Sequence, residues 1–285
     1  MEEDIFYIEN QKQQINKIVD DMTLFDDDLM SHVFDKNIEA TELVLRIILG
    51  QDIKVISVDG QDELKNPIVG GRDITLDVHA IDSHGKEIDI EVQGNAKGAI
   101  VERARFHSSM VDARMLKAGE EFKNLKDSYV IFIYKNDKFK EGQPMYHIDR
   151  IVRETGKPFE DGSHIIYVNG NYKGDDEIAK LMADFHQKGS GDIHFKALAE
   201  GVKHFKETEE GREVMCESVE KYAVEYAEKY AKEYGKECAK KQEISTKLDV
   251  ARNLIKDAGF SIDQVIKVLK IGKDQQEFFV SQLQK

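Results

Sequence analysis

Two short segments in which apolar and polar residues alternate constrain the fold of this chain more than any other feature. They read DITLDVHAID and KEIDIEVQ, and the turn Ser83, His84 and Gly85 separates them. Because side chains two apart on a strand share a face, this pattern predicts a β-hairpin with one polar and one apolar face. The predicted polar face holds Asp73, Thr75, Asp77, Asp89, Glu91 and Gln93, and the apolar face holds Ile74, Leu76, Val78, Ile88, Ile90 and Val92.

The polar face of this hairpin offers only hard oxygen ligands. Glu91 and Gln93 point the same way, and strand pairing can bring Asp77 opposite them. Two carboxylates and an amide oxygen form the ligand set that Mg²⁺ or Mn²⁺ prefers, and such an ion can activate water against a phosphate ester. A solvated strand face produces the same pattern, so spacing alone does not decide between the two interpretations.

The rest of the chain predicts an α/β fold. Apolar residues at three- and four-residue spacing predict helices over residues 29–49 and 99–126. Residues 52–61 and 164–170 have strand patterns, and the apolar run 129–134 is typical of a strand covered on both faces. Further helical patterns extend over residues 175–207, 209–243, 251–258 and 262–271. This order of elements favours an α/β sandwich.

The hairpin also has a recognisable context. The segment GGRDITLDVHAIDSHGKEIDIEVQ is preceded by DDDLMSHVFDKNIEATELVLRIIL and followed by VERARFHSSM. Together these segments resemble the PD-(D/E)XK nuclease family transposases, a group of recombination-promoting nucleases, over residues 25–175. In that group a strand ending in Leu-Asp-Val is joined to a strand that reads Ile-Glu-x-Gln, with Gln where other PD-(D/E)XK enzymes have Lys. Residues 76–78 and 90–93 match this pattern without a gap.

The resemblance implies a restriction-endonuclease-like core, with a mixed central sheet flanked by helices and an α-helical C-terminal extension. It also implies a metal-dependent DNA endonuclease associated with transposition or recombination. Asp77 and Glu91 would bind Mg²⁺ or Mn²⁺, and Gln93 would help to position the attacking water. Because Gln cannot ionise, Gln93 would not act as a general base.

Three further acids are candidates for the same site. Asp73 lies four residues before Asp77 on the predicted polar face, and it is either an accessory acid or a solvated residue. Glu39 and Glu42 lie on the predicted first helix, from which related nucleases often contribute an acid. The sequence does not choose among the three.

The charge distribution limits how the chain can bind nucleic acid. The net charge of −14 argues against binding by bulk electrostatics. Residues 94–126, however, contain seven Lys or Arg against four Asp or Glu. Within this stretch Arg103 and Arg105 lie nearest the predicted site, so we expect them to contact DNA phosphates, unless they belong to an ordinary solvated helix face. His107 is expected to be a packing or surface residue.

We expect three regions along the chain. Residues 1–30 form a peripheral segment, residues 31–205 the nuclease-like domain, and residues 206–285 a charged helical region. Tyr and Ala repeat every four residues from Tyr222, which indicates either an exposed amphipathic helix or a surface for homo-oligomer formation. The segment GFSIDQVIKVLKI is weakly similar to a helix-turn-helix.

A second functional interpretation stays open. A catalytically inactive descendant of the family would bind DNA or a protein partner and oligomerise through its helical tail. RNA cleavage has less support, because no feature predicts contacts to 2′-hydroxyls. Only two cysteines are present, and we identify neither a secretion signal nor a membrane span, so we expect a cytoplasmic protein.

Overall fold

The computed structural model describes residues 2–95 and 98–283, without the side chains of residues 2–11, most of 225–243 and 273–274. The chain divides into two compact units, Met1–Glu220 and Lys221–Lys285.

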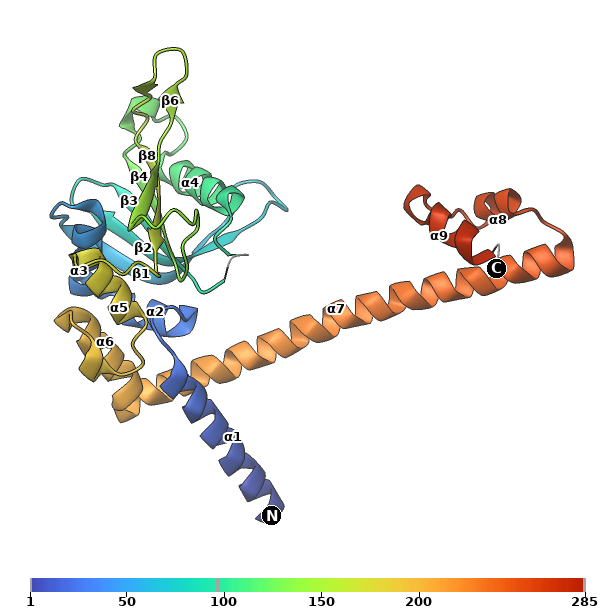
Figure 1. Cartoon of the computed structure of the whole chain (residues 1–285), viewed down its shortest axis with the longest axis horizontal. Helices are drawn as coiled ribbons and strands as arrows, with labels where there is room; N and C mark the ends of the chain where they lie inside the picture. Colours follow the sequence, from blue (N-terminus) through green and yellow to red (C-terminus); the bar gives the residue numbers. More distant parts are fainter. Residues whose placement is uncertain (1, 96–97, 284–285) are drawn as a thin grey trace. The chain divides into compact units, whose positions relative to one another are not determined.

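A six-stranded mixed sheet forms the centre of the first unit (Figure 1). The strands are β1 (Val55–Leu64), β2 (Ile74–Asp82), β3 (Glu87–Gln93), β4 (Ser128–Tyr134), β5 (Met145–Ile148) and β8 (Ser163–Asn169). Their spatial order is β1-β2-β3-β4-β8-β5, with parallel pairing from β3 through β4 to β8 and antiparallel pairing elsewhere. Every residue of β3 is buried, so Asp89, Glu91 and Gln93 are covered by protein and not solvated, whereas Asp73 and Thr75 of the predicted polar face are exposed.

Helices cover both faces of this sheet (Figure 1). The main core lies between one face and four helices, α2 (Asp27–Phe34), α3 (Ile38–Leu49), α5 (Glu177–Phe185) and α6 (Lys196–Glu207). On the other face α4 (Val101–Met115) packs Ala104 and Val111 against the strands. This architecture confirms the predicted α/β fold, a mixed central sheet flanked by helices.

Helix α4 is shorter than the helix predicted over residues 99–126. It ends at Met115, and Gly119 follows with a φ of +90°, a conformation that favours glycine and does not continue a helix. A 3₁₀ turn, η1 (Phe122–Asn124), leads into β4. Another 3₁₀ turn, η2 (Ser190–Asp192), precedes α6.

Part of the expected peripheral segment contributes to the main core. Helix α1 (Glu2–Asp21) is followed by a turn in which the Asp26 carboxylate accepts a hydrogen bond from the Thr23 amide, at 2.8 Å. The turn directs Leu24 and Phe25 into the core. The boundaries expected at residues 30 and 205 remain predictions.

A small hairpin, β6 (Ile151–Val152) and β7 (Lys157–Pro158), interrupts the chain between β5 and β8. Helix α7 (Glu209–Ala258) begins in the first unit and continues without a break through the separate helix predicted over residues 251–258.

The second unit has a small core of its own. Leu248 of α7 packs with Ile271 and Phe279, which belong to the segment containing α8 (Ile262–Val268) and α9 (Lys273–Leu283). A capping box between Ser261 and Gln264 begins α8, as the sequence indicates. Most side chains of the Tyr-Ala repeat lie outside the described residues, so the oligomerisation surface stays a prediction, as does the helix-turn-helix. Within the part of the chain that the structure describes, no helix has the length and apolarity to cross a bilayer.

Candidate functional site

The regular pairing of β2 with β3 ends beside Asp77. The β2–β3 ladder runs from the Val78–Ile90 pair to the Ile81–Glu87 pair, and beyond it the Asp77 carboxylate accepts a hydrogen bond from the amide of Val92, at 2.9 Å. Val78 packs in the main core, whereas Ile74 and Leu76 pack under α4. The expectation that Ile74, Leu76 and Val78 share one face is therefore wrong, because regular alternation stops at Asp77.

Glu91 is the centre of a buried polar cluster. Its side chain is fully buried, and its Oε1 accepts a hydrogen bond from the Asp77 amide at 3.1 Å. Its Oε2 accepts from Arg103 Nη2 at 2.5 Å and from Gln93 Nε2 at 3.5 Å. The structure thus brings together the three residues that the sequence selects, and it adds Arg103 to them.

Asp89 and His107 complete the cluster. The Asp89 side chain is fully buried, and His107 Nδ1 donates to its Oδ2 at 2.9 Å. His107 Nε2 then accepts from Arg103 Nε at 3.2 Å, so the imidazole is neutral with its proton on Nδ1. Burial lowers the pKa of His107, which agrees with this form. The alternation in the sequence puts Asp89 on the same strand face as Glu91, but alternation alone does not distinguish a buried acid from a solvated one.

The cluster concentrates negative charge away from water. Burial raises the pKa of Asp77 and of Asp89 well above the usual range, and a neighbouring carboxylate, Glu91 or Asp77, raises each further. Burial and the charge of Asp89 raise the pKa of Glu91 to about 8. Without a compensating cation, the cluster therefore retains protons at neutral pH.

The donor set suits a divalent cation. One ligand atom each from Asp89, Glu91 and His107 lies within 4.8 Å of the others. Among the described residues Asp89 Oδ1 is buried without a hydrogen-bond partner, as a free metal ligand would be. Carboxylate oxygens predominate, which favours Mg²⁺ or Mn²⁺ over softer metals.

An acid from α2 also approaches the cluster. Asp27 lies in the first turn of α2, and its charge contributes to the raised pKa of Asp77. The pKa of Asp27 is itself raised by partial burial, with Arg103 acting in the opposite direction. In the sequence, Asp27 belongs to the acidic run Asp26 to Asp28, which precedes an apolar helical pattern and lies within the expected peripheral segment, residues 1–30.

The other accessory acids have different partners. Glu42 accepts a hydrogen bond from the amide of Val55 at 2.9 Å, and Glu39 lines a separate cavity with it beside α3. Asp73 lines the cleft in front of Asp77, but its carboxylate accepts from the Asn66 amide at 2.8 Å and pairs with Lys65 at 3.2 Å. The hydrogen bond from Asn66, followed by the contact with Lys65, lowers the pKa of Asp73.

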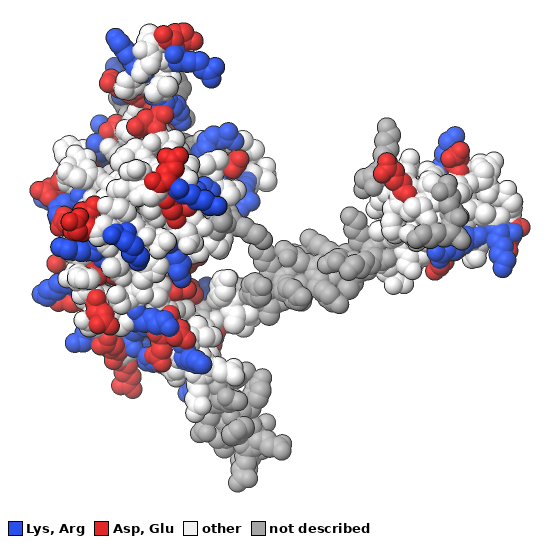
Figure 2. Space-filling model, in the orientation of Figure 1, with Lys and Arg blue, Asp and Glu red and all other residues white. Residues whose placement is uncertain are grey.

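A cleft of about 770 Å³ opens in front of Asp77 between β2 and α4. Arg103, Arg105 and Arg72 line it, so it combines an acidic floor with a cationic wall. On the face shown in Figure 2, Lys and Arg are otherwise interspersed with Asp and Glu. Any attraction for a polyanion is therefore local, as the net charge indicates.

Comparison with known families decides the affiliation. A family model described as PD-(D/E)XK nuclease family transposase matches residues 35–184. The chain belongs to this family. No curated protein and no solved structure matches it. Membership in the PD-(D/E)XK family supports a nuclease or transposition-related function and the use of a divalent metal.

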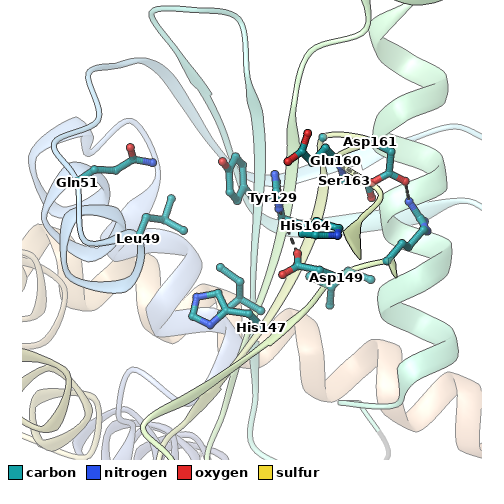
Figure 3. Close-up of a pocket in the computed structure, with 14 residues that line it drawn as sticks. Leu49, Gln51, Tyr129, His147, Asp149, Glu160, Asp161, Ser163 and His164 are labelled. Atoms are coloured by element: carbon teal, nitrogen blue, oxygen red, sulfur yellow. Dashed lines mark hydrogen bonds and ion pairs between the residues drawn. The ribbon is translucent and has the colours of Figure 1, made fainter. Parts of the chain in front are cut away.

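A second cavity, of about 320 Å³, lies away from the acidic cluster of this PD-(D/E)XK fold (Figure 3). It is near the starts of β4 and β8, where the ring of Tyr129 stacks on His164 with centroids 4.6 Å apart. His164 also pairs with Asp149 at 3.5 Å, and Arg150 pairs with Asp161. These charged side chains of the cavity are thus already paired with one another.

The absence of a side chain at Gly98 leaves space for the Gln93 amide. A Cβ atom at Gly98 would lie 1.6 Å from Gln93 Oε1, so Gly98→Ala must displace the amide from Glu91. We expect a loss of about tenfold or more in metal-dependent cleavage, with little change in melting temperature, because a displacement of about 1 Å can reduce a rate this much. Initial rates of plasmid nicking test this. Gly94→Ala is the matched control, since its Cβ would meet only the Phe25 carbonyl oxygen at an ordinary 3.5 Å. Equal effects of both substitutions would contradict the prediction.

The raised pKa of Glu91 predicts how stability depends on pH. The metal-free folded protein retains a proton up to about pH 8, whereas the unfolded chain releases it near the ordinary value of 4.5. The folded state then binds more protons in this range, so its stability falls as the pH rises from 4.5 to 8. We expect the melting temperature in EDTA to fall more steeply for wild type than for Glu91→Gln. Glu102→Gln, an exposed change of equal charge, should follow wild type. Parallel curves for wild type and Glu91→Gln would exclude this titration.

Proposed function

We propose that the chain is a Mg²⁺- or Mn²⁺-dependent DNA endonuclease that acts in transposition or recombination. The observation that supports this most directly is the contact of Glu91 with Asp77 and Gln93, beside a cleft that Asp77 lines and that arginines wall. Asp77 and Glu91 would hold the cation, and Asp27 and Asp89 are the next acids available to it.

The cation and the side chains would divide the reaction between them. When bound, a divalent cation polarises the scissile phosphate and lowers the pKa of the attacking water. Gln93, already directed at Glu91, would orient that water without accepting its proton. Arg103 and Arg105 would bind the phosphate backbone in the cleft, for which the guanidinium fork is suited.

One observation favours the second candidate function, an inactive binding module. Arg103 pairs with Glu91 without any metal, and Gln93 replaces the usual Lys, so the cluster would persist as a structural element. Such a protein would bind DNA or a protein through its cleft and self-associate through residues 206–285.

Incubation of purified protein with supercoiled plasmid separates these functions. We expect nicked and linear products with Mg²⁺ or Mn²⁺, and intact plasmid with EDTA. Parallel reactions with RNA and with single-stranded DNA define the substrate, and light scattering on the same sample measures self-association. Plasmid left intact with both metals, across a range of salt concentrations, would exclude the endonuclease and leave the binding module.

A further inference from the structure

Arg103 joins the buried cluster to the open cleft. Its side chain is about one-third exposed, and it contacts Glu91 at 2.5 Å and His107 at 3.2 Å. Its guanidinium carbon also lies 6.0 Å from the ring centroid of Phe132. One cation thus contacts a fully buried acid of the site and also lines the cleft where a substrate would enter.

The contacts of Glu91 leave little room for a second cation. Its Oε1 accepts from the Asp77 amide, and its Oε2 accepts from both Arg103 and Gln93, at 3.1, 2.5 and 3.5 Å. A carboxylate oxygen has two lone pairs, so Oε2 is fully engaged. A divalent ion that binds Oε2 must therefore displace Arg103, and one that binds the remaining lone pair of Oε1 lies close to the guanidinium, so the two like charges repel in either position.

Two contacts would hold Arg103 nearby after it leaves Glu91. The Asp89 carboxylate fixes the Nδ1 proton of His107, which leaves the Nε2 lone pair directed at Arg103 Nε. The face of Phe132 provides a cation–π contact on another side. The guanidinium then stays in the cleft, beside Arg105.

We propose that Arg103 is an exchangeable cationic partner of Glu91, which contacts this carboxyl group in the metal-free protein, is displaced by the divalent cation, and then binds the phosphate backbone of the substrate. Its first part concerns the metal site alone, and its last part rests on the proposed DNA endonuclease function. Asp89 and His107 are then positioning residues for Arg103. The cation would replace the guanidinium at Glu91, so the buried carboxyl group has a cationic partner in both states.

The proposal predicts opposite effects of one substitution on two ligands. Arg103→Met removes the competitor of the metal, so we expect Mn²⁺ to bind the full-length, DNA-free protein at least about fivefold more tightly. The same substitution removes a phosphate contact, so binding to duplex DNA in Ca²⁺ should weaken by about tenfold. Calorimetry or electron paramagnetic resonance measures the first quantity, and fluorescence anisotropy the second.

Arg105→Met is the matched control. Arg105 lies on the same helix and lines the same cleft, but the structure places it exposed, and no contact with Glu91 is found among the described residues. It should weaken DNA binding and leave Mn²⁺ affinity within about twofold of wild type. A circular dichroism spectrum of each variant verifies folding.

A measurement on wild type does not depend on any variant's folding. Titration with diamagnetic Mg²⁺ should shift the guanidinium Nη–H resonances of Arg103 in a ¹⁵N spectrum, because Nη2 loses its contact with Glu91. Unchanged or weaker Mn²⁺ binding by Arg103→Met, or an Arg103 side-chain resonance that does not shift at saturating Mg²⁺, would overturn the proposal. Tighter Mn²⁺ binding by Arg103→Met in a protein that neither binds nor cleaves DNA would uphold the exchange at Glu91 and refute the endonuclease.

Discussion

Glu91→Gln should reduce metal-dependent DNA cleavage on the order of 10³-fold while the protein stays folded. Gln has nearly the shape of Glu, but it removes the negative charge that Asp77, Arg103 and Gln93 surround. The substitution therefore removes the anionic ligand at the centre of the cluster and leaves the packing of β3 against α4 intact. Initial rates of plasmid nicking over a range of Mg²⁺ concentrations measure the effect.

The control for this substitution changes the same charge in the same cleft. Glu102 lines the cleft, but its side chain is exposed at the start of α4. Glu102→Gln should change the rate by less than about threefold, as expected of a solvated charge. Similar losses in the two variants would mean that overall charge, and not metal ligation by Glu91, controls the activity. Asp77→Asn should behave like Glu91→Gln if both acids hold the cation.

Lys206→Met should destabilise the first unit by about 3 kcal/mol or more, because each hydrogen bond to a charged donor contributes about 1.5 kcal/mol or more. Lys206 is only 6% exposed, and its ammonium group donates to the carbonyl oxygens of Asp20, Met22 and Lys188, at 2.8, 2.7 and 2.6 Å. Met fills a similar volume but leaves three main-chain acceptors without this donor. The expected fall in melting temperature is about 6–12 °C, which differential scanning calorimetry detects.

Lys203→Met controls for the loss of a positive charge on α6. Lys203 is exposed, so its substitution should lower the melting temperature by no more than about 2 °C. If the two variants have the same melting temperature, the three carbonyl contacts of Lys206 contribute nothing to stability. DNA cleavage at low temperature should be similar in both variants, because Lys206 contacts α1, the residues after it and the end of the α5 segment, and no residue of the acidic cluster.

The sequence was sufficient to predict the hairpin and to place Glu91 and Gln93 on one face, because a two-residue period fixes which side chains share a face. It placed Asp77 beside them through strand pairing and the resemblance to a known family, although regular alternation stops at Asp77. It predicted the mixed α/β fold for the same reason and through the resemblance to a known family. It did not predict that a helix covers the polar face, because polarity ordinarily indicates exposure. As a result Asp89 was not distinguished from a solvated acid, and His107 was not recognised as its hydrogen-bonding partner.

The contribution of Asp27 depended on tertiary packing. An acid on the first helix of the domain was expected near the metal, and Glu39 and Glu42 were the candidates. The structure instead brings α2 against β2, whereas Glu42 accepts a hydrogen bond from the amide of Val55. Periodicity identifies the buried face of each helix, but it does not tell which of two successive helices approaches a given strand.

The position of the β6–β7 hairpin has a consequence for how this family can diversify. The hairpin lies between β5 and β8, and β4 separates both of these strands from β3, which bears Glu91 and Gln93. Doubling the length of such an excursion costs only about 0.6 kcal/mol of closure entropy, and the acids need not move. Residues can therefore be inserted or deleted there, by evolution or by design, while the acidic cluster stays unchanged.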